Sequence, residues 1–135
     1  KGNEDLSGHN IMDFANDTVR VILQEQGKFT VERREESPNA GLESRPLQSL
    51  ENNAKYEGEW NKSSNTREGY GVQVWEDGSL YEGYWKNNRA NGPGRLIHAD
   101  GDVYEGDWYE DKAHGQGAAH HRLRQASLGE KGDTE

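Results

Sequence analysis

Cysteine is absent from this sequence of 135 residues, and methionine occurs once. Without cysteine the chain has no disulfide framework, no thiolate metal site and no thiol nucleophile. No apolar run approaches the roughly 18 to 20 residues of a membrane span, and no basic segment followed by an apolar stretch indicates a signal peptide. Basic charge is also scarce, because 16 Lys and Arg against 25 Asp and Glu give a net charge of −9. That balance argues against nucleic-acid binding, which needs a basic surface to neutralise phosphate.

Sequence signatures of catalysis are missing as well. There is no Gly-x-Ser-x-Gly elbow and no glycine-rich loop ending in Lys-Ser or Lys-Thr. His114, His120 and His121 are three potential metal ligands within eight residues, but no cysteine supports them and no acidic residue lies between them. A flexible tail rarely prearranges such ligands. We therefore expect a protein that is not an enzyme and that holds no metal and no cofactor.

The aromatic residues that the chain does have are concentrated in its middle. All four Trp, all six Tyr and eleven of the seventeen Gly lie between residues 55 and 117, whereas both Phe and most aliphatic residues precede them. This concentration argues against disorder there, although a chain of such low hydrophobicity and high charge would often be disordered. We expect an N-terminal helical segment over residues 1–31, a polar linker over 32–49, a repeat array over 50–117 and a flexible polar tail over 118–135.

An internal repeat occupies the predicted array. Tyr-Glu-Gly-x-Trp occurs at residues 56–60, 81–85 and 104–108, each copy is followed by Gly-x-Gly, and Asp-Gly turns lie between the units. Most positions step by 23 residues, and the first aromatic block steps by 25 because two extra residues lie between it and its Gly-x-Gly pair. The structural positions of the repeat are Tyr56, Gly58, Trp60, Gly69, Gly71, Gly78, Tyr81, Gly83, Trp85, Gly92, Gly94, Gly101, Tyr104, Gly106, Trp108, Gly115 and Gly117.

Each unit has the pattern of a β-hairpin. Asp-Gly flanked by strand-forming residues predicts hairpins with strands near 72–76 and 80–85, and near 95–99 and 103–108. Alternation along a strand places Tyr, Gly and Trp of one block on the same face, where a ring from the neighbouring unit fills the gap that glycine leaves. The Gly-x-Gly pairs suit a tight reversal toward the next hairpin. The expected fold is therefore mainly β, with stacked antiparallel hairpins in an elongated sheet.

This pattern closely resembles the MORN repeat (membrane occupation and recognition nexus), over about three units. The resemblance implies a non-enzymatic interaction or scaffold module that binds other proteins of a larger assembly. Similar proteins are common in ciliary axonemes, notably radial spoke heads, and in cytoskeletons, so a cytoplasmic, ciliary or cytoskeletal location is expected. Two alternatives are a regulatory leader of a phosphatidylinositol-phosphate kinase or lysine methyltransferase, and a phosphoinositide-binding module. Partner, organelle and oligomeric state stay open.

The face opposite the rings offers a candidate partner-binding strip. Like charges would align there across the stacked units, which is either a solvated face or a docking strip for a basic or amphipathic segment. Such a row disfavours binding to anionic lipid, since the basic residues of the array are scattered. The outward-facing residues are Glu57, Glu59, Glu82, Tyr84, Glu105 and Asp107.

The two ends have different patterns. Asn10 followed by Asp13 resembles a helix N-terminus, and apolar residues at helical spacing predict a helix at about 11–25 that ends at Gly27. This helix either caps the open end of the array or docks into another protein. A short strand at 47–50 would pair with the first aromatic block. In the tail, Arg124 three residues before Ser127 is typical of a kinase substrate, which makes Ser127 a candidate phosphorylation site.

Overall fold

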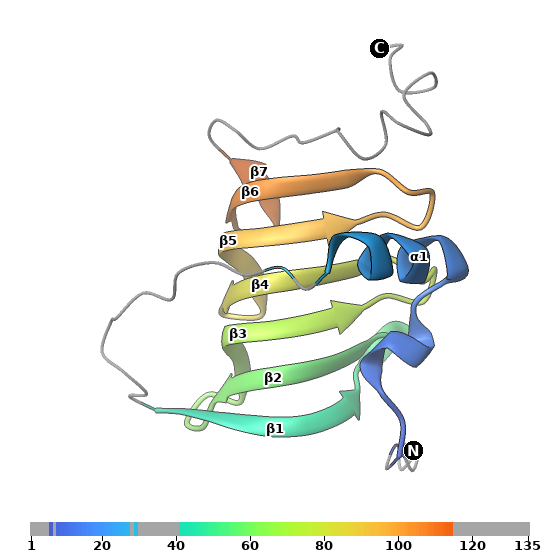
Figure 1. Cartoon of the computed structure of the whole chain (residues 1–135). Coiled ribbons are helices and arrows are strands. Elements are labelled where there is room, and N and C mark those ends of the chain that lie inside the picture. The colour runs from blue at the N-terminus through green and yellow to red at the C-terminus, as the bar shows by residue number, and fades with distance from the viewer. Residues whose placement is uncertain (1–5, 7, 28, 30–40, 115–135) are drawn as a thin grey trace.

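Seven antiparallel strands form one open sheet in the computed structural model, which describes residue 6, residues 8–27, residue 29 and residues 41–114. Each strand pairs with its neighbours in the sequence (Figure 1). The predicted mainly β fold with an N-terminal helix is confirmed, and the expected flexible tail lies outside the described residues. The strands are β1 (Leu42–Ser49), β2 (Lys55–Asn61), β3 (Thr66–Val74), β4 (Leu80–Lys86), β5 (Arg89–Ile97), β6 (Val103–Tyr109) and β7 (Lys112–His114).

Two kinds of turn join the strands of the repeats. At the predicted Asp-Gly turn between β3 and β4, the Gly78 amide donates to the carbonyl of Trp75 (2.8 Å), and the Ser79 amide donates to the Asp77 carboxylate (2.9 Å). At the other end of the strands, β4 and β5 are joined by Asn87 and Asn88, both at positive φ (49° and 69°). Two such residues form the type I′ turn that matches the twist of paired strands.

The prediction that the Gly-x-Gly pairs make this second reversal is wrong. Residues 69–71 lie inside β3 and residues 92–94 lie inside β5. The reversals are made by Asn87-Asn88 and by the equivalent pair Glu110-Asp111, whose φ angles are also positive. Gly71 and Gly94 serve close packing of the aromatic face instead, as described below.

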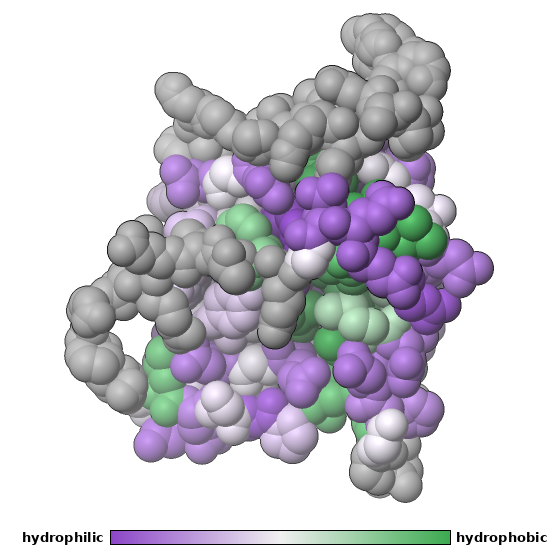
Figure 2. Space-filling view, in the orientation of Figure 1, coloured by the Kyte–Doolittle hydropathy of each residue, from purple (hydrophilic) through white to green (hydrophobic). Residues whose placement is uncertain are grey.

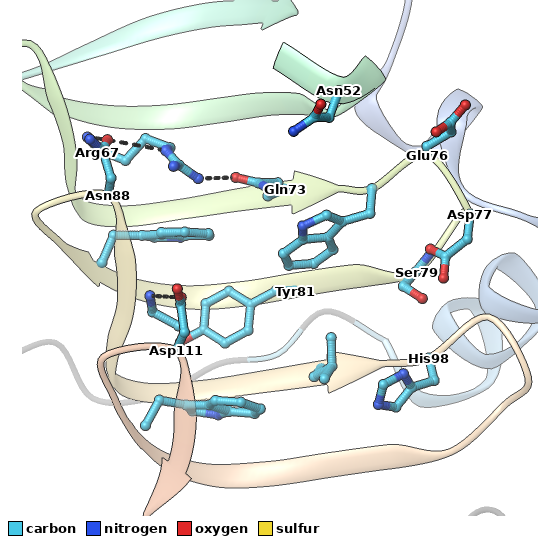
Figure 3. Close-up of a pocket in the computed structure, with 15 residues that line it drawn as sticks. Asn52, Arg67, Gln73, Glu76, Asp77, Ser79, Tyr81, Asn88, His98 and Asp111 are labelled. Carbon is cyan, nitrogen blue, oxygen red and sulfur yellow. Dashed lines mark hydrogen bonds between the residues drawn. The ribbon is translucent and has the colours of Figure 1, made fainter. Parts of the chain in front are cut away.

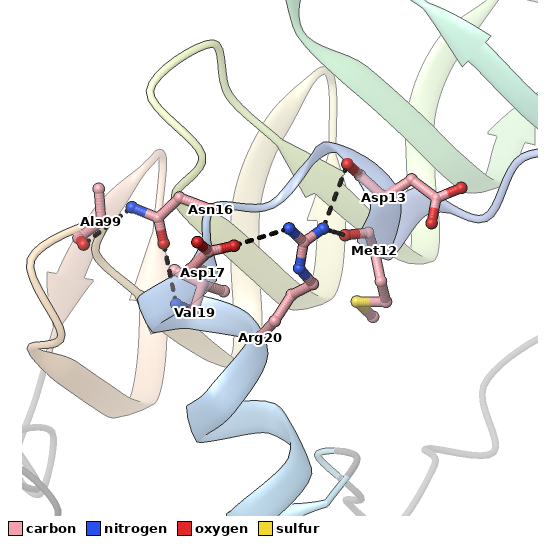
Figure 4. Close-up of polar contacts among 7 residues, drawn as sticks. All are labelled: Met12, Asp13, Asn16, Asp17, Val19, Arg20 and Ala99. Atoms are coloured by element: carbon pink, nitrogen blue, oxygen red, sulfur yellow. Dashed lines mark hydrogen bonds and ion pairs between the residues drawn. The ribbon is translucent and has the colours of Figure 1, made fainter.

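The N-terminal segment contains two short helices where a single helix was predicted. Asn10 caps a 3-10 helix, η1 (Ile11–Phe14), and Asn16 caps α1 (Asp17–Gln26) by accepting from the Val19 amide at 2.9 Å. The second cap interrupts the predicted helix, because an N-cap residue adopts an extended conformation. Asn16 also donates from Nδ2 to the carbonyl of Ala99 (3.0 Å), which ties α1 to the turn between β5 and β6 (Figure 4).

The helix α1 packs across one face of the sheet (Figure 1). It does not cover the open end of the array, so the alternative in which this helix caps the array is wrong. Where α1 lies, the surface is mainly hydrophilic, and hydrophobic surface borders it (Figure 2). Beneath the helix is a small aliphatic core in which Val19, Leu80 and Ile97 are fully buried. The whole core comprises Ile11, Ala15, Val19, Val74, Leu80, Ile97 and Val103.

Strand β1 lies within the segment that was expected to be a linker. The predicted short strand at 47–50 is real but longer, because Leu42–Ser49 pairs with β2. The pairing shifts register between Arg45 and Gln48, around Pro46. Proline donates no hydrogen bond and is tolerated at such an irregularity on an edge strand.

Candidate functional site

An interlocked row of tyrosine and tryptophan rings covers the sheet face opposite α1. Tyr56 contacts Trp60 of its own unit and Trp85 of the next, with ring centroids 5.3 and 5.5 Å apart. Tyr81 contacts Trp85 and Trp108 in the same way, at 5.2 and 5.4 Å. All four pairs meet edge to face, an arrangement that stabilises by about 0.5–1.5 kcal/mol per pair beyond area burial. The predicted contact between rings of successive units is therefore present.

The glycine gaps are filled by the tyrosine of the same unit, which corrects the prediction that a neighbouring ring fills them. The hydroxyl end of Tyr81 lies against both Gly83 on its own strand and Gly94 on β5, and it donates to the carbonyl of Tyr84 at 3.1 Å. Neighbouring units are linked by tryptophan instead, because Trp85 Nε1 donates to the carbonyl of Gly71 at 3.1 Å. The same contacts recur one unit away at Tyr56, Gly58, Gly71, Trp108 and Gly94.

Burial raises the pKa of the Tyr56 and Tyr81 hydroxyls far above the value of about 10 for a solvated tyrosine. The folded state therefore holds both protons at a pH where the unfolded chain loses them. We expect these two hydroxyls to leave the free energy of unfolding unchanged below about pH 10 and to lower it above that pH, by up to about 2.7 kcal/mol per pH unit for the pair. Urea denaturation between pH 9 and 11 measures this slope.

The tyrosine contribution is isolated by two variants. Tyr56→Phe should remove about half of the alkaline slope, whereas Tyr109→Phe should leave it unchanged because Tyr109 is 56% exposed. Equal slopes in the two variants would show that buried tyrosine does not govern alkaline unfolding.

A groove of about 700 Å³ runs over the aromatic face (Figure 3). It is lined by Trp85, Leu96 and Trp108 of the aromatic face, and by Trp75, which is 36% exposed. Polar residues border the groove at both ends of the strands. One end carries the type I′ turns and the other carries the Asp-Gly turn. These border residues are Asn88 and Asp111, and Glu76 and Asp77. The arrangement suits a ligand that is apolar in part and polar at its ends.

Arg67 is the cation of this groove. Its guanidinium lies 4.8 Å from the centroid of the Trp85 ring and 5.9 Å from that of Tyr56. Nε donates to Asn88 Oδ1 at 3.3 Å, and Nη1 donates to Gln73. Burial lowers the pKa of the guanidinium, which stays charged at neutral pH because arginine starts so high. Stacking and hydrogen bonds thus hold a charged group in a fixed position.

The strip predicted on the opposite face is only partly exposed. Glu57 and Asp107 are exposed and Glu59, Tyr84 and Glu105 are half-buried, but Glu82 is buried beneath α1. The expectation of a solvated Glu82 is wrong, because the helix covers this strand. Glu57, Glu82 and Glu105 are also not adjacent in the sheet, since Val72 and Arg95 lie between them in register. A partner-binding role for the strip stays a prediction.

Glu82 forms a buried ion pair with Arg95, which sequence reasoning missed. Their side chains meet at 2.8 Å and are 2% and 3% exposed. Arg95 also donates to the carbonyl of Gly27 (2.7 Å) just after α1 and lies 3.5 Å from the Glu105 carboxylate. The favourable interaction of a cation with the C-terminal end of a helix adds to the pair. Arg95 thus links the sheet to the helix.

Within the described residues, no helix is long and apolar enough to cross a membrane. Across the same ranges, no group of three or more His, Asp or Glu side chains could hold a metal ion. His120, His121 and Ser127 lie outside the described residues, as do Gly115 and Gly117.

Comparison with known proteins agrees with the fold. The family model of the MORN repeat matches three consecutive segments, residues 56–80, 81–103 and 104–118. A search of curated proteins found no match. The matched segments begin at the aromatic blocks whose rings interlock in the structure. MORN repeats are generally modules for interaction with proteins or lipids, and are not catalytic. The interlocked hairpins and the three consecutive matches together identify the chain as a MORN-repeat protein.

Proposed function

We propose that this chain is a non-enzymatic module that binds a segment of a partner protein and acts as a scaffold within a larger assembly. The observation that carries the proposal is the groove on the aromatic face, which α1 leaves uncovered because it packs on the opposite face. Residues on that opposite face support the fold by contact with the helix. The groove, by contrast, presents Trp75 to a ligand at 36% exposure, whereas the Trp85 and Trp108 side chains that also line it are 5% and 8% exposed.

The chemistry of the groove is that of a protein interface. Tryptophan, tyrosine and arginine are the side chains most enriched where binding energy concentrates, and all three line it. The carboxylates of Glu76, Asp77 and Asp111 border the same groove and disfavour an anionic membrane surface. These features support a protein partner over a lipid one.

Trp75→Ala is expected to weaken partner binding by about 30-fold or more, since aromatic hot-spot residues at an interface contribute about 2 kcal/mol or more. Trp75 is 36% exposed, so its removal should change stability little. The control is Val21→Ala on the outer surface of α1, where Val21 is 50% exposed. Affinity is measured by titration with the partner that a native pull-down recovers.

Cross-linking mass spectrometry locates the bound surface. A cross-linker that reacts with carboxylates should link the partner to Glu76, Asp77 or Asp111 at the groove, and not to Glu57 on the opposite face. Links confined to Glu57 and Asp107, with Trp75→Ala binding normally, would reject the groove as the interface.

A further inference from the structure

Arg67 differs from every other described arginine in having no carboxylate within ion-pair distance among the described residues. The other four are paired, at distances from 2.6 to 3.6 Å. The pairs are Arg20 with Asp17, Arg45 with Glu43, Arg89 with Glu110, and Arg95 with Glu82. A half-buried guanidinium that lacks a carboxylate partner can accept one from a ligand.

The hydrogen bonds of Arg67 leave one donor group unused. Nε and Nη1 donate to the amide oxygens of Asn88 and Gln73, which are neutral. No described atom accepts a hydrogen bond from Nη2. Asp111 is the acidic residue whose charge reaches Arg67, but its carboxylate lies beyond ion-pair distance of the guanidinium and accepts from the Ala90 amide at 2.8 Å. Arg67 lines the groove, where a guanidinium can bind a carboxylate oxygen through a nitrogen that has no other acceptor.

The repeat shows that the sheet does not need arginine at this position. Arg67 pairs in register with Trp60, and the equivalent partners of Trp85 and Trp108 are Ala90 and Ala113. Alanine therefore satisfies the backbone and the packing of the other two units. The first unit places a charge where its successors place a methyl group, so that the groove has a cation at one site only.

We propose that Arg67 is a specificity-determining residue that binds an acidic side chain of the partner segment, with the aliphatic or aromatic neighbours of that side chain packed over Leu96 and Trp75. The inference rests on the proposed function and adds to it the chemistry of the partner. The occupant is a peptide carboxylate rather than a lipid phosphate, because Glu76, Asp77 and Asp111 line the same groove. A multiply charged headgroup would meet these carboxylates as well as the arginine.

The probe is a phage-displayed library of random 12-residue peptides, selected against the full chain. Selected peptides should share an Asp or Glu at a fixed spacing from apolar residues. Arg67→Met keeps the stem of the side chain over Trp85 and removes the charge, and it should weaken these peptides by about 10- to 100-fold, as expected for a hydrogen bond to a charged group. The matched control is Arg89→Met, since Arg89 is exposed and pairs with Glu110 outside the groove.

A charge reversal separates recognition from a structural role. Arg67→Glu should lose the acidic peptide and bind its variant in which the acidic residue is replaced by lysine. Circular dichroism and thermal melting of each variant check that the fold is kept.

Four results would overturn the inference. Peptides without an acidic preference, or equal binding by Arg67→Met and Arg89→Met, would reject Arg67 as the carboxylate site while leaving the groove as an interface. Vesicles containing phosphatidylinositol bisphosphate that displace the peptide and lose binding in Arg67→Met would assign the site to phosphate. A library that yields no groove-binding peptide would reject the proposed function together with this inference.

Discussion

Glu82→Ala is expected to lower the free energy of unfolding by about 3–5 kcal/mol, because it leaves Arg95 charged and buried without its partner. Glu82 and Arg95 lie beneath α1, where water cannot replace the lost carboxylate. Glu105 lies 3.5 Å from Arg95 and is 24% exposed, so it compensates only in part. Urea denaturation at pH 7 measures the change.

The repeat supplies a matched control for this prediction. Glu57 occupies the same repeat position as Glu82 but is exposed, so Glu57→Ala should change stability by less than about 0.5 kcal/mol. A second test replaces both partners, since Glu82→Met with Arg95→Met removes the unpaired charge and should recover most of the loss. If Glu82→Ala and Glu57→Ala cost the same, the helix does not bury the pair in solution.

The spacing of residues within the repeat predicted those features of the fold that depend on local sequence. Alternation along a strand placed Tyr81, Gly83 and Trp85 on one face, and Asp77-Gly78 marked a turn, because both follow from the chemistry of neighbouring residues. The burial of Glu82 could not be predicted in this way. It depends on where a helix about sixty residues away packs, and the repeat carries no information on that.

The errors at the turns have a different physical origin. Glycine suits a reversal because it tolerates positive φ, but its missing Cβ also suits a strand that must let a ring approach its backbone. Gly71 and Gly94 have the second role, since the rings of Tyr56 and Tyr81 lie against them. The better turn signal was Asn87-Asn88 directly after the strand, because asparagine tolerates the left-handed conformation that a type I′ turn requires.

The sequence predicted only part of the candidate groove. The sequence predicted the aromatic face with a core role for its rings, and it placed the candidate partner-binding strip, with a solvated face as the alternative, on the opposite side. The signal that could have identified Arg67 was present as a mismatch in the repeat, where Ala90 and Ala113 stand 23 and 46 residues later. Departures from a repeat are informative because the shared positions already satisfy the fold.

Gly83→Ala is expected to lower the free energy of unfolding by about 3 kcal/mol or more. A Cβ atom there would lie 2.5 Å from the Cα atom of Gly94 and 2.6 Å from the carbonyl oxygen of Pro93. Both are backbone atoms of the paired strand β5, and the Tyr81 hydroxyl is 2.8 Å from the same point. Overpacking of a flexible side chain costs about 1–3 kcal/mol, and here no flexible group can move aside. Urea denaturation again gives the change.

Gly41→Ala separates the packing cost from the cost of backbone conformation. Gly41 has a φ of 77°, and no atom lies within 4 Å of the position of its Cβ, so alanine there meets only backbone strain of about 1–2 kcal/mol. The difference between the two variants therefore measures how closely β4 and β5 approach beneath the ring of Tyr81. Should Gly83→Ala prove no more damaging than Gly41→Ala, the strands must stand further apart than the interlocked rings require, and a groove floored by those rings would lose its physical basis.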